Sequence, residues 1–71
     1  MNILVFKTSV TRLRQVNRVQ TLLSNVKAIA DWNFDLDDCD NILRIVSADL
    51  SPRYIENILQ KAGINCEELA P

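Results

Sequence analysis

The residues of this chain that could bind a metal are two cysteines and a run of aspartates. Cys39 and Cys66 lie far apart and form no Cys-x-x-Cys pair, and the chain contains no histidine. Two cysteines in a small domain without an export signal are typical of free thiols rather than of a disulfide framework. We therefore expect no thiolate metal site within one copy of the chain.

The acidic run 35–40 has the spacing Asp-x-Asp-Asp-x-Asp. Calcium-binding loops of the EF-hand type also need a glycine at the sharp turn and a distal glutamate, and this run has neither. We predict a solvated turn. With no histidine and a single glycine, the chain offers no evident general base and no Gly-rich phosphate loop, so neither enzymatic activity nor a bound cofactor is expected.

The length of 71 residues predicts one domain, 1–71, that buries only about 60% of its unfolded surface. No apolar run approaches the roughly 18 residues that a membrane-spanning helix needs. The N-terminal segment carries Lys7 after its apolar residues and lacks a cleavage site, unlike a signal peptide. We expect a cytoplasmic protein with no membrane insertion.

Hydropathy periodicity predicts six elements. The apolar run 3–6 predicts a strand, and a helix should follow it, with an N-cap at Thr8, Ser9 or Thr11. The apolar positions of that helix recur at steps of three or four: Leu13, Val16, Val19, Leu23 and Val26. Residues 30–36 then alternate, with one predicted core face formed by Ala30, Trp32, Phe34 and Leu36.

The second half of the chain continues the pattern. Turn-forming residues 37–41 precede a strand at 42–47, which predicts a hairpin. Ser51 and Pro52 predict the start of a second helix, Gly63 its end, and residues 64–69 the last strand. Right-handed crossovers place both helices on one face of a sheet. The predicted fold class is α+β: a ferredoxin-like βαββαβ sandwich with antiparallel strand order 4-1-3-2.

Two segments carry a family resemblance. Residues 54–69 (YIENILQKAGINCEEL) and 19–26 (VQTLLSNV) are similar to the second helix with the last strand, and to the back half of the first helix, of heavy-metal-associated (HMA) domains. This family comprises small copper chaperones and metal-binding modules of ATPases. The resemblance implies the ferredoxin-like fold and a Met-x-Cys-x-x-Cys metal loop between the first strand and the first helix.

The metal motif of that family is missing. Counting back from Val19 places it on Val10, Arg12 and Gln15, so both thiolates are absent. An arginine guanidinium repels a cation. Cys39 is expected in an exposed turn after the second strand, and Cys66 in the core on the fourth strand. These two strands lie at opposite edges of the predicted sheet, about 14 Å apart, so the two thiols are too far apart to share one ion within a chain. The resemblance therefore implies a metallochaperone-like domain that has lost its metal site.

Charge is segregated along the chain. Residues 1–27 hold five bases and no acid, whereas residues 28–40 hold five acids and no base. Such runs are usually solvated faces that attract each other within the fold. They can instead orient a charged partner, and the basic face of the first helix would then consist of Arg12, Arg14 and Arg18. Nucleic acid is not expected, because Asp31 and Asp35 would repel phosphate.

The open face of the sheet is the other candidate surface. If Leu4 and Phe6 face the helices, an outward apolar stripe should consist of Ile3, Val5, Ile42 and Val46. The alternative interpretation is that these side chains are only partly exposed on a small sheet and contact no partner. The predicted function is a non-catalytic interaction module that binds a protein partner or a second copy through this face or the first helix. The alternative is a metal-handling protein that uses Cys39 or Cys66 in an intermolecular site.

Overall fold

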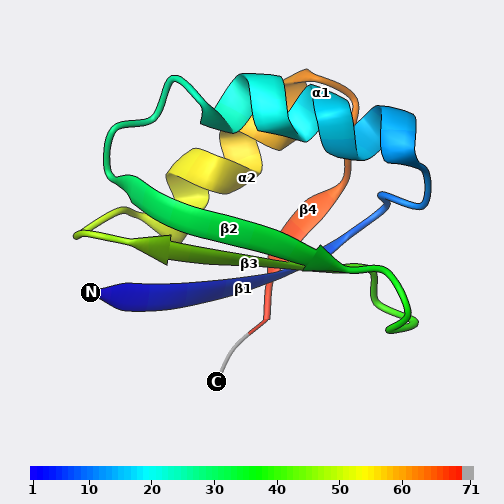
Figure 1. The fold of residues 1–71 in the computed structure, drawn as a ribbon, viewed down its shortest axis with the longest axis horizontal. Helices are drawn as coiled ribbons and strands as arrows, with labels where there is room; N and C mark the ends of the chain where they lie inside the picture. The colour runs from blue at the N-terminus through cyan, green and yellow to red at the C-terminus, as the bar shows by residue number, and fades with distance from the viewer. Residues whose placement is uncertain (70–71) are drawn as a thin grey trace.

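Two helices cover one face of a four-stranded antiparallel sheet, and no helix covers the other face (Figure 1). The computed structural model describes residues 1–69. Its elements are β1 (Asn2–Thr8), α1 (Leu13–Leu23), β2 (Ile29–Asp35), β3 (Ile42–Ser47), α2 (Pro52–Lys61) and β4 (Cys66–Glu68). The strand order β2-β3-β1-β4 confirms the predicted ferredoxin-like topology. Within residues 1–69, neither helix combines the length and apolar character that crossing a membrane requires.

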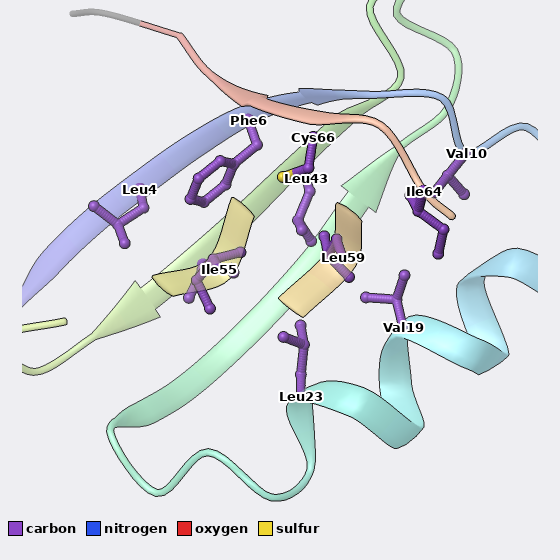
Figure 2. Close-up of a cluster of buried hydrophobic side chains, with 11 residues drawn as sticks. Leu4, Phe6, Val10, Val19, Leu23, Leu43, Ile55, Leu59, Ile64 and Cys66 are labelled. Atoms are coloured by element: carbon purple, nitrogen blue, oxygen red, sulfur yellow. The ribbon is translucent and has the colours of Figure 1, made fainter. Parts of the chain in front are cut away.

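The core lies between the sheet and the two helices. Leu4 and Phe6 of β1 point toward Ile55 of α2 (Figure 2), and Phe6 is completely buried. Ile3, one residue out of phase, is 68% exposed on the opposite face. The predicted phase of β1 is therefore confirmed, because alternate residues of a strand point to opposite faces.

The predicted start and stripe of α1 were partly wrong. Arg12, directly before Leu13, is the N-cap in place of Thr8, Ser9 or Thr11. The Thr8 and Ser9 hydroxyls make contacts with other segments. Leu13 is 72% exposed, and Val26 lies beyond the end of the helix. Within the predicted stripe, the remaining positions are buried or packed against the core: Val16, Val19 and Leu23.

Strand β2 departs from strict alternation at a bulge. Ile29 lies opposite Ser47, whereas Asp31 lies opposite Val46, so the register shifts between them. Ile29 therefore packs against the core and Ala30 is exposed, contrary to the predicted alternation. Leu36 is also wrong as a core residue, since it lies past the strand end and is 37% exposed.

The two aromatic residues of β2 lie on the helix side, as predicted. Trp32 and Phe34 pack against the core, with ring centroids 5.8 Å apart in an edge-to-face arrangement. They are only partly buried because β2 is at the edge of the sheet. The pair thus leaves some aromatic surface accessible beside that edge.

Helix α2 begins and ends as predicted. The Ser51 hydroxyl accepts a hydrogen bond from the Arg53 N–H, and Pro52 is the first helical residue. At the other end, Gly63 (φ 82°) donates to the carbonyl of Gln60 at 3.0 Å, and Ile64 donates to that of Leu59 at 2.9 Å. This pair of bonds is a Schellman motif. Ile64 is buried but precedes β4, which is shorter than the predicted strand.

Replacing Gly63 should cost stability through its backbone conformation alone. A Cβ added at this position meets no atom within 4 Å, so Gly63→Ala should lower the free energy of unfolding by about 1 kcal/mol because of the positive φ. Gly63→Asn is the matched control and should cost less, since asparagine visits this region more readily. Urea denaturation measures both. Equal losses would contradict the Schellman assignment.

Candidate functional site

The loop at 9–12 joins β1 to α1 and includes two of the positions, Val10 and Arg12, that the resemblance assigns to the metal motif. Val10 is completely buried in the core. The carboxamide oxygen of Gln15 accepts hydrogen bonds from the N–H groups of Thr11 at 2.8 Å and Arg12 at 3.1 Å. Gln15 therefore satisfies backbone donors at the start of the helix. The residue at the position assigned to the second thiolate, Gln15, thus stabilises the start of α1.

The electrostatics of this loop oppose a cation. Arg12 occupies the N-cap of α1, Arg14 lies in the first turn, and that turn contains no acidic residue. The N-terminus of a helix carries a partial positive charge. Two guanidinium groups next to it raise the local potential further, and no thiolate is present to offset them. A soft cation would meet repulsion here.

Three connections meet at this end of the sheet. The Thr8 hydroxyl donates to the carbonyl of Asn41 at 2.7 Å, which ties β1 to the hairpin turn. The Ser9 N–H donates to the carbonyl of Asn65 at 3.1 Å, and the Asn65 N–H donates back to the Ser9 hydroxyl at 3.0 Å. These contacts attach the β1–α1 loop to both neighbouring connections.

The two cysteines have the predicted environments. Cys39 is exposed and Cys66 is buried, with 3% of its surface accessible. Burial, and to a lesser extent the Glu56 carboxylate, raise the pKa of the Cys66 thiol to about 12. Metals bind the thiolate, so Cys66 is a poor ligand in the folded protein.

The hairpin turn comes closer to β1 than a count of strands implies. Thr8 donates its N–H to the carbonyl of Asp40 at 3.2 Å and is itself paired with Cys66. The predicted edge-to-edge separation therefore overstates the distance between the turn and β4. The burial of Cys66, and not the distance between strands, is therefore what keeps its thiol from binding a metal.

The turn gathers three potential ligand groups, and two of them, Asp38 and Asp40, already have other contacts. Ligand atoms of Asp38, Cys39 and Asp40 lie within 4.8 Å of one another. The Asp38 carboxylate accepts the Asp40 N–H at 2.9 Å, and Asp40 forms an ion pair with Lys7 at 3.8 Å. Exposed carboxylates in a turn commonly make such contacts without a metal.

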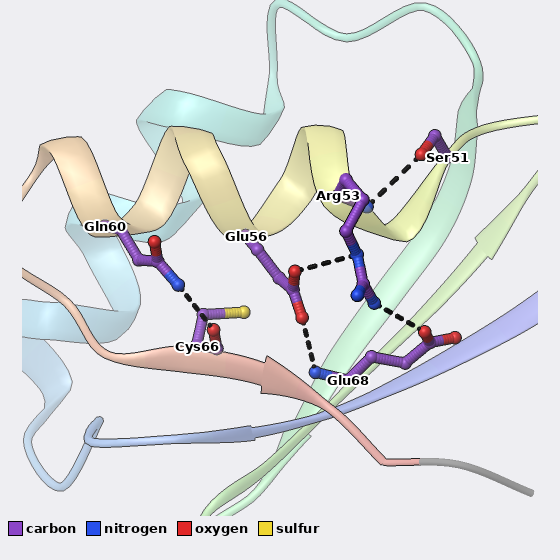
Figure 3. A network of polar contacts seen from close by, with 6 residues as sticks. All are labelled: Ser51, Arg53, Glu56, Gln60, Cys66 and Glu68. Atoms are coloured by element: carbon purple, nitrogen blue, oxygen red, sulfur yellow. Dashed lines mark hydrogen bonds and ion pairs between the residues drawn. The ribbon is translucent and has the colours of Figure 1, made fainter.

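A polar network links α2 to β4 (Figure 3). Arg53 pairs with Glu56 at 2.9 Å and with Glu68 at 2.6 Å. Glu56 also accepts the Glu68 N–H at 2.7 Å, and the Gln60 side chain donates to the carbonyl of Cys66 at 3.0 Å. The sequence analysis missed this network, although residues 53, 56 and 60 share one helix face by their spacing.

The groove beside this network has no single charge character. Its volume is about 660 Å³. Its charged lining residues carry both signs, namely Lys7, Arg53, Glu56 and Glu67. Arg53 and Glu56 are already paired with each other. The groove thus offers no concentrated field for a charged ligand.

The apolar stripe on the open face differs from the prediction. Ile42 is only 5% exposed, which makes it wrong as a member of an accessible stripe. It is flanked by Lys7 on β1 and Asp35 on β2, and Asp40 of the adjoining turn pairs with Lys7. Ile42 therefore cannot offer much surface to a partner.

The accessible apolar residues form a smaller group near the other end of the open face. Ile3 lies opposite Val46, and Val5, two residues along β1, accepts the N–H of Leu69 through its carbonyl at 2.9 Å. Arg44 lies opposite Val5 and separates Val46 from Ile42 along β3. We call Ile3, Val5, Val46 and Leu69 the open-face patch. The sequence analysis missed Leu69, whose place follows from the pairing of β4 with β1.

The arginines of the first helix are exposed as predicted. Arg12, Arg14 and Arg18 make no ion pair with any residue of the part of the chain that the structure describes. Arg14 and Arg18 border a shallow groove of about 400 Å³ with Leu22 at its apolar side. We call these three arginines the arginine face.

Solved structures of metal-binding domains are similar to this chain. The yeast copper transporter domain CCC2A has a TM-score of 0.84 at 18% identity, over 99% of this chain and 97% of that one. A copper-binding domain from HMA7, a P-type ATPase, has a TM-score of 0.82 at 20% identity, over 99% and 96%. The N-terminal domain of ZntA in its Zn(II) form has a TM-score of 0.75 at 15% identity, over 93% and 89%.

The chain has the fold of a heavy-metal-associated domain. No protein-family model and no curated protein sequence matches it. The fold therefore agrees with the resemblance in residues 19–26 and 54–69. Sequence identities of this size establish architecture, and the chemistry of the site has to be argued from its own residues.

The two cysteines should differ in reactivity. Cys39 should react with a thiol reagent in the native protein, whereas Cys66 should react only at the rate of unfolding, because burial excludes the reagent and disfavours the thiolate. Mass spectrometry of the labelled single variants Cys39→Ser and Cys66→Ser separates the two rates. Fast native labelling of Cys66 would contradict its burial.

The raised pKa also predicts an alkaline loss of stability. Unfolding lowers the thiol pKa from about 12 to its ordinary value of 9.0, so the unfolded state releases the proton first as the pH rises. The free energy of unfolding should fall between pH 9 and 12. Cys66→Ala should remove that part of the slope in denaturation measured across this range, and an unchanged slope would contradict the assignment.

Proposed function

We propose that this chain is a non-catalytic interaction module with the fold of a metal-binding domain and without a thiolate site in its β1–α1 loop. The observation that carries the proposal is the state of that loop and the first helical turn: Arg12 occupies the N-cap position, and the Gln15 carboxamide oxygen accepts hydrogen bonds from two backbone N–H groups. A soft metal needs thiolate, thioether or imidazole ligands, and neither side chain supplies one.

The open-face patch supports binding of a protein partner or a second copy. Ile3 exposes 68% of its surface on a sheet face that no helix covers. Val46 lies directly opposite Ile3, and Leu69 lies beside Val5. Ile3 is exposed, and Val5, Val46 and Leu69 are half-buried beside it. A contiguous group of accessible aliphatic side chains favours a protein contact. Standard interfaces bury about 800 Å² per partner, so a patch of four side chains suits a transient contact.

The arginine face is the other candidate contact surface. Its three guanidinium groups have no ion-pair partner within residues 1–69, and residues 1–27 contain no acid that could neutralise them. A contact there would select an acidic partner and weaken with salt. The open-face patch should show little salt dependence, which separates the two surfaces experimentally.

One observation favours a second candidate function. Cys39 is exposed, and carboxylate oxygens of Asp38 and Asp40 lie within 4.8 Å of its sulfur and of each other. A metal could in principle be shared between the Cys39 thiols of two copies. The buried Cys66 thiol, with its pKa of about 12, does not support a role in such a site.

Restoring two thiolates should restore affinity for a soft metal. We expect Arg12→Cys with Gln15→Cys to bind copper(I) more tightly than the wild type in competition with a chelator, because it removes the guanidinium and adds two soft ligands. Val10 is left unchanged because it is fully buried. Without metal, the free energy of unfolding of this variant should fall by about 1 kcal/mol, because the Gln15 contacts at the start of α1 are removed.

The matched control for this test is Arg12→Ser with Gln15→Ser. It removes the same guanidinium and the same carboxamide contacts and supplies no thiolate. If the folded cysteine variant gains no more affinity than the serine variant, the alignment on Arg12 and Gln15 is wrong, and the proposal loses its main support.

Charges placed in the open-face patch should weaken association before they affect folding. Val5→Lys with Val46→Glu puts two charges on the uncovered face and removes no helix-facing side chain. Sedimentation should report weaker self-association or partner capture, and the thermal midpoint should change by no more than a few degrees. The control, Asn57→Lys with Asn25→Glu, introduces the same charges at exposed positions elsewhere.

Two outcomes would contradict the role of the open-face patch. A large loss of stability in Val5→Lys with Val46→Glu would mean that these side chains are packed in the core. Unchanged stability with unchanged association would place the contact elsewhere, and a steep salt dependence would then favour the arginine face.

A further inference from the structure

The two edges of the sheet differ in whether another strand can pair with them. β4 is three residues long, and α2 side chains occupy its outer backbone groups. Successive residues of a strand direct their backbone N–H and C=O groups to opposite sides. Because Leu69 donates its N–H to β1, the backbone groups of Glu68 and Cys66 point away from β1. The Glu68 N–H is held by Glu56 and the Cys66 carbonyl by Gln60 (Figure 3). This edge is closed.

The edge at β2 is longer, and of the outward backbone groups of Trp32 and Phe34 only the Trp32 N–H has a side-chain partner within residues 1–69. β2 has seven residues, and within residues 1–69 only β3 pairs with it. The Trp32 N–H is accepted by the side chain of the preceding Asp31 at 2.9 Å, so this N–H points away from β3. By the same alternation, Phe34 also directs its N–H and carbonyl outward. Edge groups of this kind can pair with an added strand.

The charges on β2 determine what can add to it. Asp31 and Asp35 lie on the open face of the strand, opposite Val46 and Ile42, and Asp37 follows in the turn. None of these three carboxylates has an ion-pair partner in the described part of the chain. A second copy of β2 would bring like charges together, which disfavours edge-to-edge pairing of two copies.

The other side of β2 has a different chemistry. Trp32 and Phe34 lie toward the helices and stay partly accessible because no strand covers their flank. The side chains of an incoming strand would point alternately to the two faces of the sheet. On the helix side they would lie beside the rings, and on the open face beside the aspartates. Its apolar side chains would therefore lie next to the rings, and its cationic side chains would lie next to the carboxylates.

We infer that the outer edge of β2 is a strand-addition site for an extended peptide segment that alternates basic and apolar residues. The site uses the Trp32 carbonyl and the Phe34 N–H and carbonyl for pairing, Asp31 and Asp35 for charge, and the aromatic pair for apolar contact. It goes beyond the proposed function, since it requires neither the open-face patch nor the β1–α1 loop. The added strand would extend the open face by one strand.

A synthetic peptide tests the inference directly. The probe is a capped nine-residue peptide that alternates lysine and valine, and the control is the same peptide with alternate backbone nitrogens methylated on its pairing edge. Trp32 is the only tryptophan in the chain, so its fluorescence reports binding at β2. The parent peptide should give a saturable signal and should slow amide exchange at Phe34, with no change at Glu68. Methylation should weaken binding at least tenfold.

Charge variants separate the role of the strand from that of the turn. Asp31→Asn with Asp35→Asn should weaken binding by about three- to tenfold at low salt. Asp37→Asn with Asp38→Asn removes the same charge next to the strand and should weaken it less. Equal binding of the methylated peptide, protection at β4 instead of β2, or equal effects of the two variant pairs would each overturn the inference.

Discussion

The packing of α1 and α2 against one face of the sheet is the constraint on which the other features depend. The chain has enough apolar residues for one core, and the largest of them, such as Phe6, Leu43 and Leu59, fill the space between the layers. Because both helices lie on the same side, no helix of residues 1–69 covers the opposite face. The same packing positions α2 so that Glu56 and Gln60 reach the outer edge of β4.

The β1–α1 loop and the start of α1 are held by contacts that involve no metal. The β1–α1 loop keeps its buried apolar anchor, Val10, and uses Gln15 to satisfy the N–H groups that begin α1. Thr8 and Ser9 meanwhile attach the loop to the hairpin turn and to the α2–β4 connection. These contacts hold the loop in a fold that resembles the solved copper- and zinc-binding domains.

Local signals in the sequence predicted the parts of the fold that they govern. Ser51, Pro52 and Gly63 specify the ends of α2 through backbone conformation and capping, which act over a few residues. The sequence could not reveal that Thr8 would donate to Asn41, because that contact spans 33 positions and depends on how the strands pair. The bulge that turns Ile29 inward likewise depends on strand pairing.

The candidate site was less predictable than the fold. Arg12 and Gln15 could be placed by counting along the chain, whereas the burial of Ile42 and the contribution of Leu69 follow from register. The proposed function requires that the wild-type chain binds no soft metal. Native mass spectrometry of the wild type with copper(I) or zinc and a moderate chelator tests it most directly. The account predicts metal-free species only. A metal-bound monomer, or a dimer holding one metal ion, would contradict it.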